Sequence, residues 1–430
     1  MAERGLLRVL GLAFGVAAVV GGVVGQGILR APGEVAEGIP YAELILAIWA
    51  LGAVVTAIDA MSIAELGSSV PKAGGPYAFA DRAFGPFGGF LTGWLDAGML
   101  IISSGYIAVV VAEYLHRLGL FADLGLGLIA AGVVIVFGLL NALGTRAGGG
   151  IQNAASAIKA LVLFGIAAAC FLFGGEAQAS EAQDATALTF AGIAAAAIAV
   201  QQTYYGASTA VYFSEEVDEP GRNLPAATFL GVAVVAAVYL AIVAALLYAM
   251  PVAAIAASNL PVADALKGIA GADGALVVTL FALFSVFAVG NIGVMQQTRT
   301  LYAMARGGFL PGALAEVAKN GSPMAALLVA VILGAALAAT GVYERLLAIG
   351  APILALVNML MGVAVIRIRM KEPSLPRPFK MPLYPLPAIL TILMNAGLTV
   401  FFTVSDLENT RWSFLIVAAA LPVYFAMRRF

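Results

Sequence analysis

Charged side chains are scarce in this sequence. Only 11% of its 430 residues are charged, while 62% are hydrophobic. A soluble domain carries about 25% charged residues. A soluble fold of this length cannot hide so much apolar surface, so we expect the chain to be surrounded by lipid.

Cysteine and histidine are almost missing. The chain has one of each, Cys170 and His116. Disulfide frameworks, Cys/His zinc sites, iron–sulfur clusters and bis-histidine haem all need more of these residues. We therefore predict no metal and no cofactor. The net charge of −2 gives no reason to expect a nucleic-acid partner.

What the sequence does contain is a series of long apolar runs. A membrane span needs about 20 apolar residues, and polar or Pro/Gly-rich loops such as 68–86 and 250–274 separate the runs. The predicted spans are 9–29, 41–66, 87–115, 124–143, 152–174, 187–213, 225–249, 275–304, 323–340, 345–368, 384–404 and 412–427. We predict an all-α membrane protein of about twelve transmembrane helices. The first run continues into further spans and lacks an Ala-x-Ala site, so no cleavable signal peptide is expected.

Lysine and arginine gather on one side of this arrangement. With both termini cytoplasmic, five of the 22 lie in outside loops and one, Lys159, lies within a span. The five outside are Arg30, Arg117, Lys267, Arg345 and Arg411. The other sixteen lie inside, as the positive-inside rule requires. We predict an integral plasma (inner) membrane protein, with lipid as its surroundings and both termini cytoplasmic.

Polar and glycine residues interrupt two of the spans. Residues 21–29 read Gly-Gly-Val-Val-Gly-Gln-Gly-Ile-Leu, and residues 201–210 read Gln-Gln-Thr-Tyr-Tyr-Gly-Ala-Ser-Thr-Ala. Free backbone groups at mid-membrane are tolerated only where they line a cavity. Packing glycines or a polar seam between helices would also explain either stretch alone. Paired interruptions in two halves of a chain, however, are the best sequence indication of a transporter site.

The two interrupted spans begin two possible five-helix repeats, about 9–174 and 187–368, in a single transmembrane domain over 1–430. At such breaks, half-helix N-termini hold an anionic group and unwound carbonyls hold a cationic one. An α-amino acid carries both groups. The sequence therefore predicts a carrier of amino acids or close relatives.

Four segments of the chain carry a family resemblance. They are 25–28 (Gly-Gln-Gly-Ile), 64–94, 215–225 (Glu-Glu-Val-Asp-Glu-Pro-Gly-Arg-Asn-Leu-Pro), and 299–308 with 377–380. Together they span most of the sequence, which resembles the amino acid–polyamine–organocation superfamily of permeases. The resemblance implies a 5+5 inverted-repeat transporter fold, with helices 1 and 6 unwound and helices 11 and 12 (about 384–427) peripheral.

The resemblance also implies a substrate site on the two interruptions. The residues implied are Gln26, Gly27 and Ile28 for a substrate carboxylate, Val23, Val24 and Tyr204 for its ammonium, and Thr203, Tyr205, Gly206 and Ala207 for the pocket. The sixth-helix pattern of the family often reads Phe-Ala-Tyr-Asp-Gly-Trp, so Thr203 and Ala207 are smaller than usual, and Gln26 replaces a serine. A larger or more polar substrate, or a lid supplied by Tyr204 or Tyr205, would fit these departures.

Lys159 lies inside the fifth span, roughly 12 Å from its start. A charge at that depth is a functional hypothesis by default, although snorkelling to the inner surface would also explain it. Sodium-independent members of the family carry a lysine here, which implies that its ammonium stands where relatives hold Na⁺, between helices 1, 5 and 8. The expected partners are carbonyls near Gly22 and the side chain of Gln296 or Gln297. A desolvated lysine can release and regain a proton, which would couple transport to H⁺, or it can stay charged in an exchanger.

Two acids, Asp59 and Asp96, also lie within spans and are possible protonation sites. Interhelical hydrogen bonds or ion pairs are the simpler explanation. At the ends of spans, Glu65, Arg82 and the pair at 215–216 are expected to form gating or structural ion pairs.

The predicted function is secondary active transport of amino acids by alternating access, sodium-independent and proton-coupled (symport). An amino acid exchanger and a polyamine or cationic amine carrier are the alternatives. A membrane enzyme would need a nucleophile–base pair or a metal cluster. Apart from a Ser/Lys dyad using Lys159, the chain offers neither, so we predict that it is not an enzyme. A channel or a transport-inactive sensor on the same fold stays open, because fold does not fix function.

Overall fold

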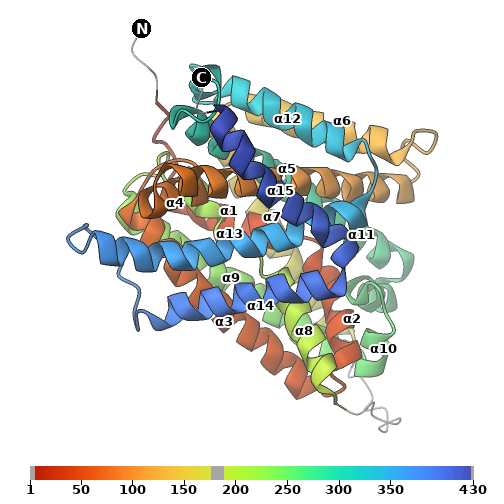
Figure 1. Ribbon diagram of the computed structural model, residues 1–430. Helices are drawn as coiled ribbons and strands as arrows, with labels where there is room; N and C mark the ends of the chain where they lie inside the picture. The colour runs from red at the N-terminus through yellow and green to blue at the C-terminus, as the bar shows by residue number, and fades with distance from the viewer. Residues whose placement is uncertain (1–4, 176–187, 428–430) are drawn as a thin grey trace.

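The computed structural model describes residues 5–175 and 188–427, and the regular elements within them are helices packed into one bundle (Figure 1). The elements are α1 (Leu12–Val23), α2 (Gly27–Gly38), α3 (Ala42–Ser69), α4 (Pro76–Phe84), α5 (Pro86–Arg117), α6 (Leu126–Ala142), α7 (Thr145–Phe173), α8 (Phe190–Thr203), η1 (Thr209–Phe213), α9 (Pro220–Ala249), α10 (Val252–Ala256), α11 (Pro261–Arg306), η2 (Gly312–Ala315), α12 (Met324–Ala338), α13 (Tyr343–Lys371), α14 (Leu386–Ser405) and α15 (Leu407–Met427). The predicted fold class is confirmed.

Each predicted span has a helical counterpart in the described part of the chain. Eight helices there are long and apolar enough to cross a membrane, and the bent pair of α1 and α2 makes a ninth. The shorter apolar helices α6, α8 and α12 account for the remaining predicted spans. The predicted start of the sixth span and second repeat, residue 187, lies outside the described residues, as do Arg4, Arg428 and Arg429, which contributed to the predicted charge bias.

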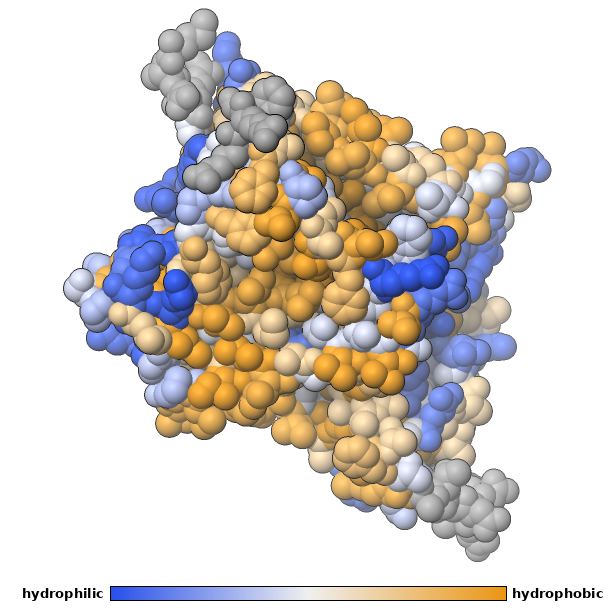
Figure 2. All heavy atoms as spheres, viewed as in Figure 1, coloured by the Kyte–Doolittle hydropathy of each residue, from blue (hydrophilic) through white to orange (hydrophobic). Residues whose placement is uncertain are grey.

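Hydrophobic side chains cover the outside of the bundle as well as its core. Leu139, Leu161 and Leu172 are each more than half exposed. In Figure 2 the hydrophobic surface fills the middle of the molecule, while hydrophilic residues gather at its left and right edges. A protein in water rarely exposes so wide an apolar surface. This band is the surface that faces lipid.

The loops lie on two opposite sides of the bundle. The N-terminal side is the one where Leu10 pairs with Val217 through an isolated bridge. The far side is the one where Gly38 packs directly against Gly192. The N-terminal side corresponds to the one predicted to be cytoplasmic.

Several boundaries differ from those predicted. The first span was expected to end at 29, but α2 continues to Gly38, because the helix restarts at a break and needs further turns to reach the far side. The predicted loop 250–274 contains α10 and the start of α11, which is kinked at Ala270 and Gly271. The predicted loop 68–86 contains α4, which begins at Pro76, a residue suited to the first turn of a helix.

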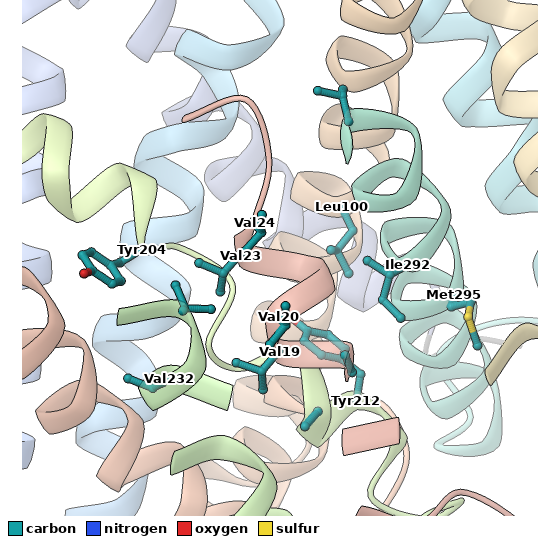
Figure 3. Close-up of a cluster of buried hydrophobic side chains, with 14 of the residues drawn as sticks. Val19, Val20, Val23, Val24, Leu100, Tyr204, Tyr212, Val232, Ile292 and Met295 are labelled. Atoms are coloured by element: carbon teal, nitrogen blue, oxygen red, sulfur yellow. The ribbon is translucent and has the colours of Figure 1, made fainter. Parts of the chain in front are cut away.

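The centre of the bundle is α1, which packs between α7, α9 and α11. The valines of α1 pack toward α11 on one side and α9 on the other. Figure 3 shows them between Ile292 and Met295 of α11 and Val232 of α9. Close approach depends on small residues: a Cβ at Gly231 of α9 would lie 2.5 Å from Val19. Small residues of this kind let helix backbones approach in lipid, where the hydrophobic effect does not drive helices together.

Candidate functional site

The first helix is broken where the sequence predicts. The segment α1 ends at Val23 and α2 begins at Gly27, with a bend of 48° between them. No side chain caps the start of α2. Because the first N–H groups of a helix have no partner within it, those of Gly27 and Ile28 are left for a ligand.

The sixth helix is broken as well. The segment α8 ends at Thr203, the chain turns through 204–208, and η1 begins at Thr209. Gly206 has φ +114°, a conformation that side-chain-bearing residues rarely adopt. A Cβ there would lie 2.7 Å from the carbonyl oxygen of Gly22. The two breaks therefore rest directly on each other.

A central cavity of about 440 Å³ lies between the two breaks and helices α5, α11 and α13. This volume falls in the range of small-molecule sites. The predicted site residues that line it are Gly22, Val23, Gln26, Gly27, Thr203, Tyr205, Gly206 and Gln296. Those that do not are Val24, Ile28, Lys159, Tyr204, Ala207 and Gln297, together with the two acids Asp59 and Asp96.

Tyr204 shows why neighbouring residues of the break separate in this way. Its side chain is buried, its hydroxyl donates to the carbonyl of Trp49 (3.3 Å), and its ring packs against Trp49 and Tyr239. Figure 3 shows Tyr204 well away from Leu100 and Ile292, which line the cavity. In this conformation the expected lid cannot come from Tyr204, whereas Tyr205 does reach the cavity wall.

The cavity extends toward the far side. Arg30 and Glu34 of α2 and Tyr343 of α13 line that end. The contact that crosses it is neutral: the Gln26 amide donates to the Tyr343 hydroxyl over 3.3 Å. The Tyr343 ring also packs edge-on against Tyr106, with centroids 5.9 Å apart.

The cavity floor, on the N-terminal side, is closed. The hydroxyl of Tyr212, which lines the cavity, donates to Asp96 Oδ1 (2.6 Å), and Thr300 donates to Asp96 Oδ2 (2.9 Å). Nearer the N-terminal side lies a buried ion pair, in which Arg299 donates to both carboxylate oxygens of Glu216 at 2.8 and 2.9 Å. Asp96 thus forms the interhelical hydrogen bonds that were the simpler expectation for it.

Ion pairs at the helix ends are found where they were expected. Glu65 pairs with Arg369 at 2.5 Å, Arg82 with Glu372 at 2.6 Å, and Arg306 with Glu215 at 2.7 Å. These predictions are confirmed. Asp59 takes no part in the central cavity and lines a separate small one behind the sixth-helix break.

Lys159 lies between α1, α7 and α11. Its ammonium donates to the carbonyls of Gly21 (3.1 Å) and Val24 (2.8 Å), and its side chain is fully buried. Ser285 of α11 donates to the same Val24 carbonyl at 3.0 Å. Snorkelling does not explain this lysine, because its charge is held by the broken segment of α1.

The expected partners Gln296 and Gln297 form no hydrogen bond with Lys159 in the described part of the chain. They follow Ser285 on the same helix by eleven and twelve residues, which is roughly 17 Å, so they lie too far toward the N-terminal side. Ser285 is the α11 side chain at this level, and it shares the Val24 acceptor with Lys159. The sequence signal for it is a single hydroxyl within an apolar run.

Sequence reasoning also missed Tyr239. Its hydroxyl lies 3.1 Å from the carbonyl oxygen of Val23 and 3.2 Å from that of Thr203, so one side chain of α9 serves both breaks. The sequence alone does not distinguish such a tyrosine from one that only fills space. Across the described residues, no three His, Cys, Asp or Glu side chains gather where a metal could bind.

Comparison with known proteins gives matches along nearly the whole chain. A model of the family described as amino acid permease matches residues 5–426. The serine/threonine exchanger SteT of Bacillus subtilis (strain 168) is 27% identical, covering 99% of this chain and 98% of the relative. The large neutral amino acids transporter small subunit 2 of Mus musculus is 29% identical, covering 98% and 81%. The cystine/glutamate transporter of Homo sapiens is 26% identical, covering 98% and 85%.

Proposed function

This chain belongs to the amino acid permease family, and on that premise we propose that it carries neutral amino acids across a membrane by alternating access, without sodium. The family and these relatives are transporters, not enzymes. The observation that carries the proposal is the meeting of two helix breaks at one cavity of about 440 Å³. Breaks of this kind offer N–H groups to a carboxylate and carbonyls to an ammonium.

The substrate carboxylate is held by the N–H groups at the start of α2, at Gln26, Gly27 and Ile28. The ammonium is received by the Val23 carbonyl, which has one acceptor position left beside Tyr239. Val24 is engaged otherwise, because Lys159 and Ser285 already donate to its carbonyl oxygen. For Val24 to bind substrate as predicted, Lys159 or Ser285 must first release its carbonyl oxygen.

A neutral side chain suits the rest of the cavity. Its α5 and α11 walls are mainly apolar, with Met99, Leu100 and Ile292 among the lining residues. The acids proposed for a polyamine carrier do not face it: Asp96 is fully hydrogen-bonded below the floor, and Asp59 lies elsewhere. These contacts favour a zwitterion over a polyamine or other cationic amine.

Lys159 makes sodium unnecessary, since its ammonium already satisfies the unwound carbonyls of Gly21 and Val24. For coupling, we propose proton symport. Loss of the proton would remove a charge that holds α1 and α7 together, and its return would restore both contacts. Exchange, with the lysine always charged, is the second candidate, and the name of the serine/threonine exchanger among the relatives favours it.

The orientation belongs to the same proposal. The N-terminal side is cytoplasmic and the far side external, with both termini inside a plasma (inner) membrane. Residues 9–174 and 187–368 form the inverted repeats, and 384–427 forms the peripheral pair. The broken helices α1 and α8, with α3 and α9, rock against α5, α6, α11 and α12 around the central cavity.

Uptake into proteoliposomes tests the proposal. A panel of labelled amino acids and amines is assayed with an inward proton gradient, with a sodium gradient, and with internal unlabelled substrate alone. Proton-stimulated, sodium-indifferent uptake supports symport, and uptake that needs internal substrate supports exchange. Sodium-dependent uptake, or no uptake of any amino acid, contradicts the proposal.

Lys159→Ala sharpens the test. Its removal leaves the Gly21 and Val24 carbonyls without their cation, so we expect at least a tenfold loss of uptake or of its response to the proton gradient. Lys267→Ala, on an exposed lysine of α11, is the matched control and should transport normally. An unchanged rate and pH profile in Lys159→Ala would show that the lysine has no coupling role.

A further inference from the structure

A second cavity lies behind the sixth-helix break, on the side away from α1. We call it the rear cavity: it has a volume of about 20 Å³ and lies between the turn at 204–208 and helices α3, α13 and α14. A space of that size holds one water molecule or one small ion. An amino acid does not fit, so the rear cavity is not a second substrate site.

Asp59 of α3 is the one carboxylate among the residues that line the rear cavity. Its Oδ1 atom is buried and has no hydrogen-bond partner. Thr391 of α14 lies close enough to interact with the carboxylate, yet its own buried hydroxyl oxygen makes no bond of normal geometry. A carboxylate within the membrane is costly unless it is paired or neutralised.

Among the described residues that line the rear cavity, none carries a positive charge to face Asp59. The titratable groups that line the rear cavity with it are Tyr204 and Tyr205 of the break, and α13 and α14 contribute the amides of Asn358 and Asn395. Lys, Arg and His are absent from the described residues that line it. Without a basic partner, the simplest way to neutralise the carboxylate is to bind a proton.

Asp96 shows a buried acid whose two oxygens both have hydrogen-bond donors in this structure. Each of its two carboxylate oxygens accepts a hydroxyl hydrogen bond, from Tyr212 and Thr300. Asp59 is equally deep in a span but has an oxygen without such a donor. The difference marks Asp59, not Asp96, as the acid with a vacant place for a proton.

The rear cavity shares its wall with the central cavity. Tyr205, Gly206 and Ser208 line both. The Tyr205 hydroxyl accepts from Asn358 (3.3 Å) and donates to Asn395 (3.4 Å), which ties the break to α13 and α14. A change in the rear cavity therefore acts on the same turn of chain that bounds the substrate.

The adjacent glutamines of the sixth helix fit this arrangement. Gln202 lines the central cavity and Gln201 lines the rear cavity. Successive helical residues point about 100° apart, so two polar neighbours serve two separate polar spaces. A single site would need only one of them.

We propose that the rear cavity is a proton-binding site with Asp59 as the acceptor, and that its occupancy is linked to amino acid binding through Tyr205 and Gly206. The proton comes from the aqueous phase and adds to a carboxylate oxygen, turning a charged acceptor into a neutral donor, with no other bond made or broken. The proposal adds a second proton site to the Lys159 of the proposed function. Only its linkage to substrate rests on that function.

Infrared difference spectroscopy between pH 8 and pH 5 tests the site without any substrate. The full chain in lipid should show a protonated carboxyl band that Asp59→Asn lacks and that Lys159→Ala keeps. The matched control is Asp273→Asn, on an exposed acid of α11, which should leave the band in place. A band that persists in Asp59→Asn, or that is missing from the wild type, would overturn the site.

Equilibrium binding tests the linkage, with L-serine, L-threonine and L-leucine as probes. Wild-type affinity should change with pH between 5 and 8, by at most about tenfold per pH unit for each linked proton, and Asp59→Asn should reduce that change to the part that Lys159 contributes. Tyr205→Phe, which keeps the carboxylate, should retain the infrared band but weaken the pH dependence. Equal pH dependence in all three proteins would overturn the linkage.

Two further outcomes separate this inference from the proposed function. If wild-type affinity at fixed pH depends on Na⁺ or K⁺ and Asp59→Asn removes that dependence, the site binds a metal cation and the proton assignment is wrong. If none of the probes binds but the Asp59 band is present, the proposed substrate is wrong while the proton site stands.

Discussion

The two halves of the bundle on either side of the helix breaks are held by different chemistry. Beyond the Asp96 hydrogen bonds of the cavity floor, the N-terminal side is closed by charge, first through the buried Arg299–Glu216 pair and then through Arg306 and Glu215. Toward the far side it is crossed by one long neutral hydrogen bond, from Gln26 to Tyr343.

This difference indicates which way the protein is open. A buried, doubly hydrogen-bonded ion pair is expensive to disrupt, whereas a neutral hydrogen bond contributes about 1 kcal/mol. The central cavity also reaches the exposed side chains of Arg30 and Glu34 on α2, so the structure is a state open toward the far side and closed at the N-terminal side. In the proposed alternating access the far half must close before the charged half releases, so that the cavity is never open to both sides.

The largest expected effect comes from breaking the buried ion pair. Arg299→Leu leaves the Glu216 carboxylate uncompensated at 0% exposure, which costs about 3–5 kcal/mol. We expect the N-terminal side to open, measured as faster labelling of Ala303→Cys in a Cys170→Ala background. Arg222→Leu is the matched control, because the Arg222–Glu219 pair is exposed, and it should change little. Unchanged labelling in Arg299→Leu would mean that the pair does not hold this side closed.

The next effect concerns the junction of the two halves. In Gly206→Ala the new Cβ would lie 2.7 Å from the Gly22 carbonyl oxygen, and the backbone φ of +114° is strained for alanine. We expect the native arrangement of the two breaks to be destabilised by at least about 1–2 kcal/mol. Substrate affinity should fall about tenfold or more. Gly165→Ala, whose Cβ meets nothing within 4 Å, is the control and should bind normally. Normal affinity in both variants would show that the breaks need not touch.

Mild acid should have little effect on the Arg306–Glu215 ion pair at the N-terminal side. Burial acts to raise the pKa of Glu215, but hydrogen bonds from Arg306 and from the backbone N–H of Ala73 outweigh it and hold that pKa below its usual value. Because this pKa is lowered, the ionised carboxylate stabilises the closed state at every pH above its ordinary value of about 4.3. That stabilisation is lost as the pH falls below this value and the carboxylate takes up a proton.

Labelling of Ala303→Cys should therefore be steady from pH 8 to pH 5 apart from the intrinsic titration of the thiol, and opening should begin near pH 4. In the same assay, Arg306→Gln should destabilise the closed state by about 1 kcal/mol and speed labelling already at pH 7. Opening of the wild type near pH 6 would contradict this assignment and transfer the pH response to another group.

The smallest effect is expected on the far side. Tyr343→Phe removes only the 3.3 Å contact from Gln26, so substrate affinity should change by about twofold, or roughly 0.5 kcal/mol. Binding of labelled amino acid measures it. A loss of tenfold or more would show that this one hydrogen bond matters far more to the far side than a neutral contact should.

The positions of the breaks and of Lys159 were predictable, because glycine, glutamine and lysine are out of place in apolar spans. What each residue of a break faces was not. The turn at 204–208 resets the helical phase, so counting along the sequence cannot show that Tyr205 reaches the central cavity while Tyr204 does not. The predicted Gln296 and Gln297 failed as partners of Lys159 for a related reason: polarity identified the helix, but only the axial distance along it identified Ser285.

The Tyr239 hydroxyl is shared by the two breaks. A phenol has a single hydrogen to donate, yet the carbonyls of Val23 and Thr203 both lie within reach of it. Tyr239 can therefore donate to only one of these two carbonyls at a time. In the proposed binding mode, a substrate ammonium at the remaining acceptor position of Val23 serves that oxygen. The Tyr239 hydroxyl can then donate to Thr203, so that substrate binding adds a hydrogen bond without breaking the set. The two breaks therefore have one more acceptor than Tyr239 can serve, and the proposed substrate would supply the further donor.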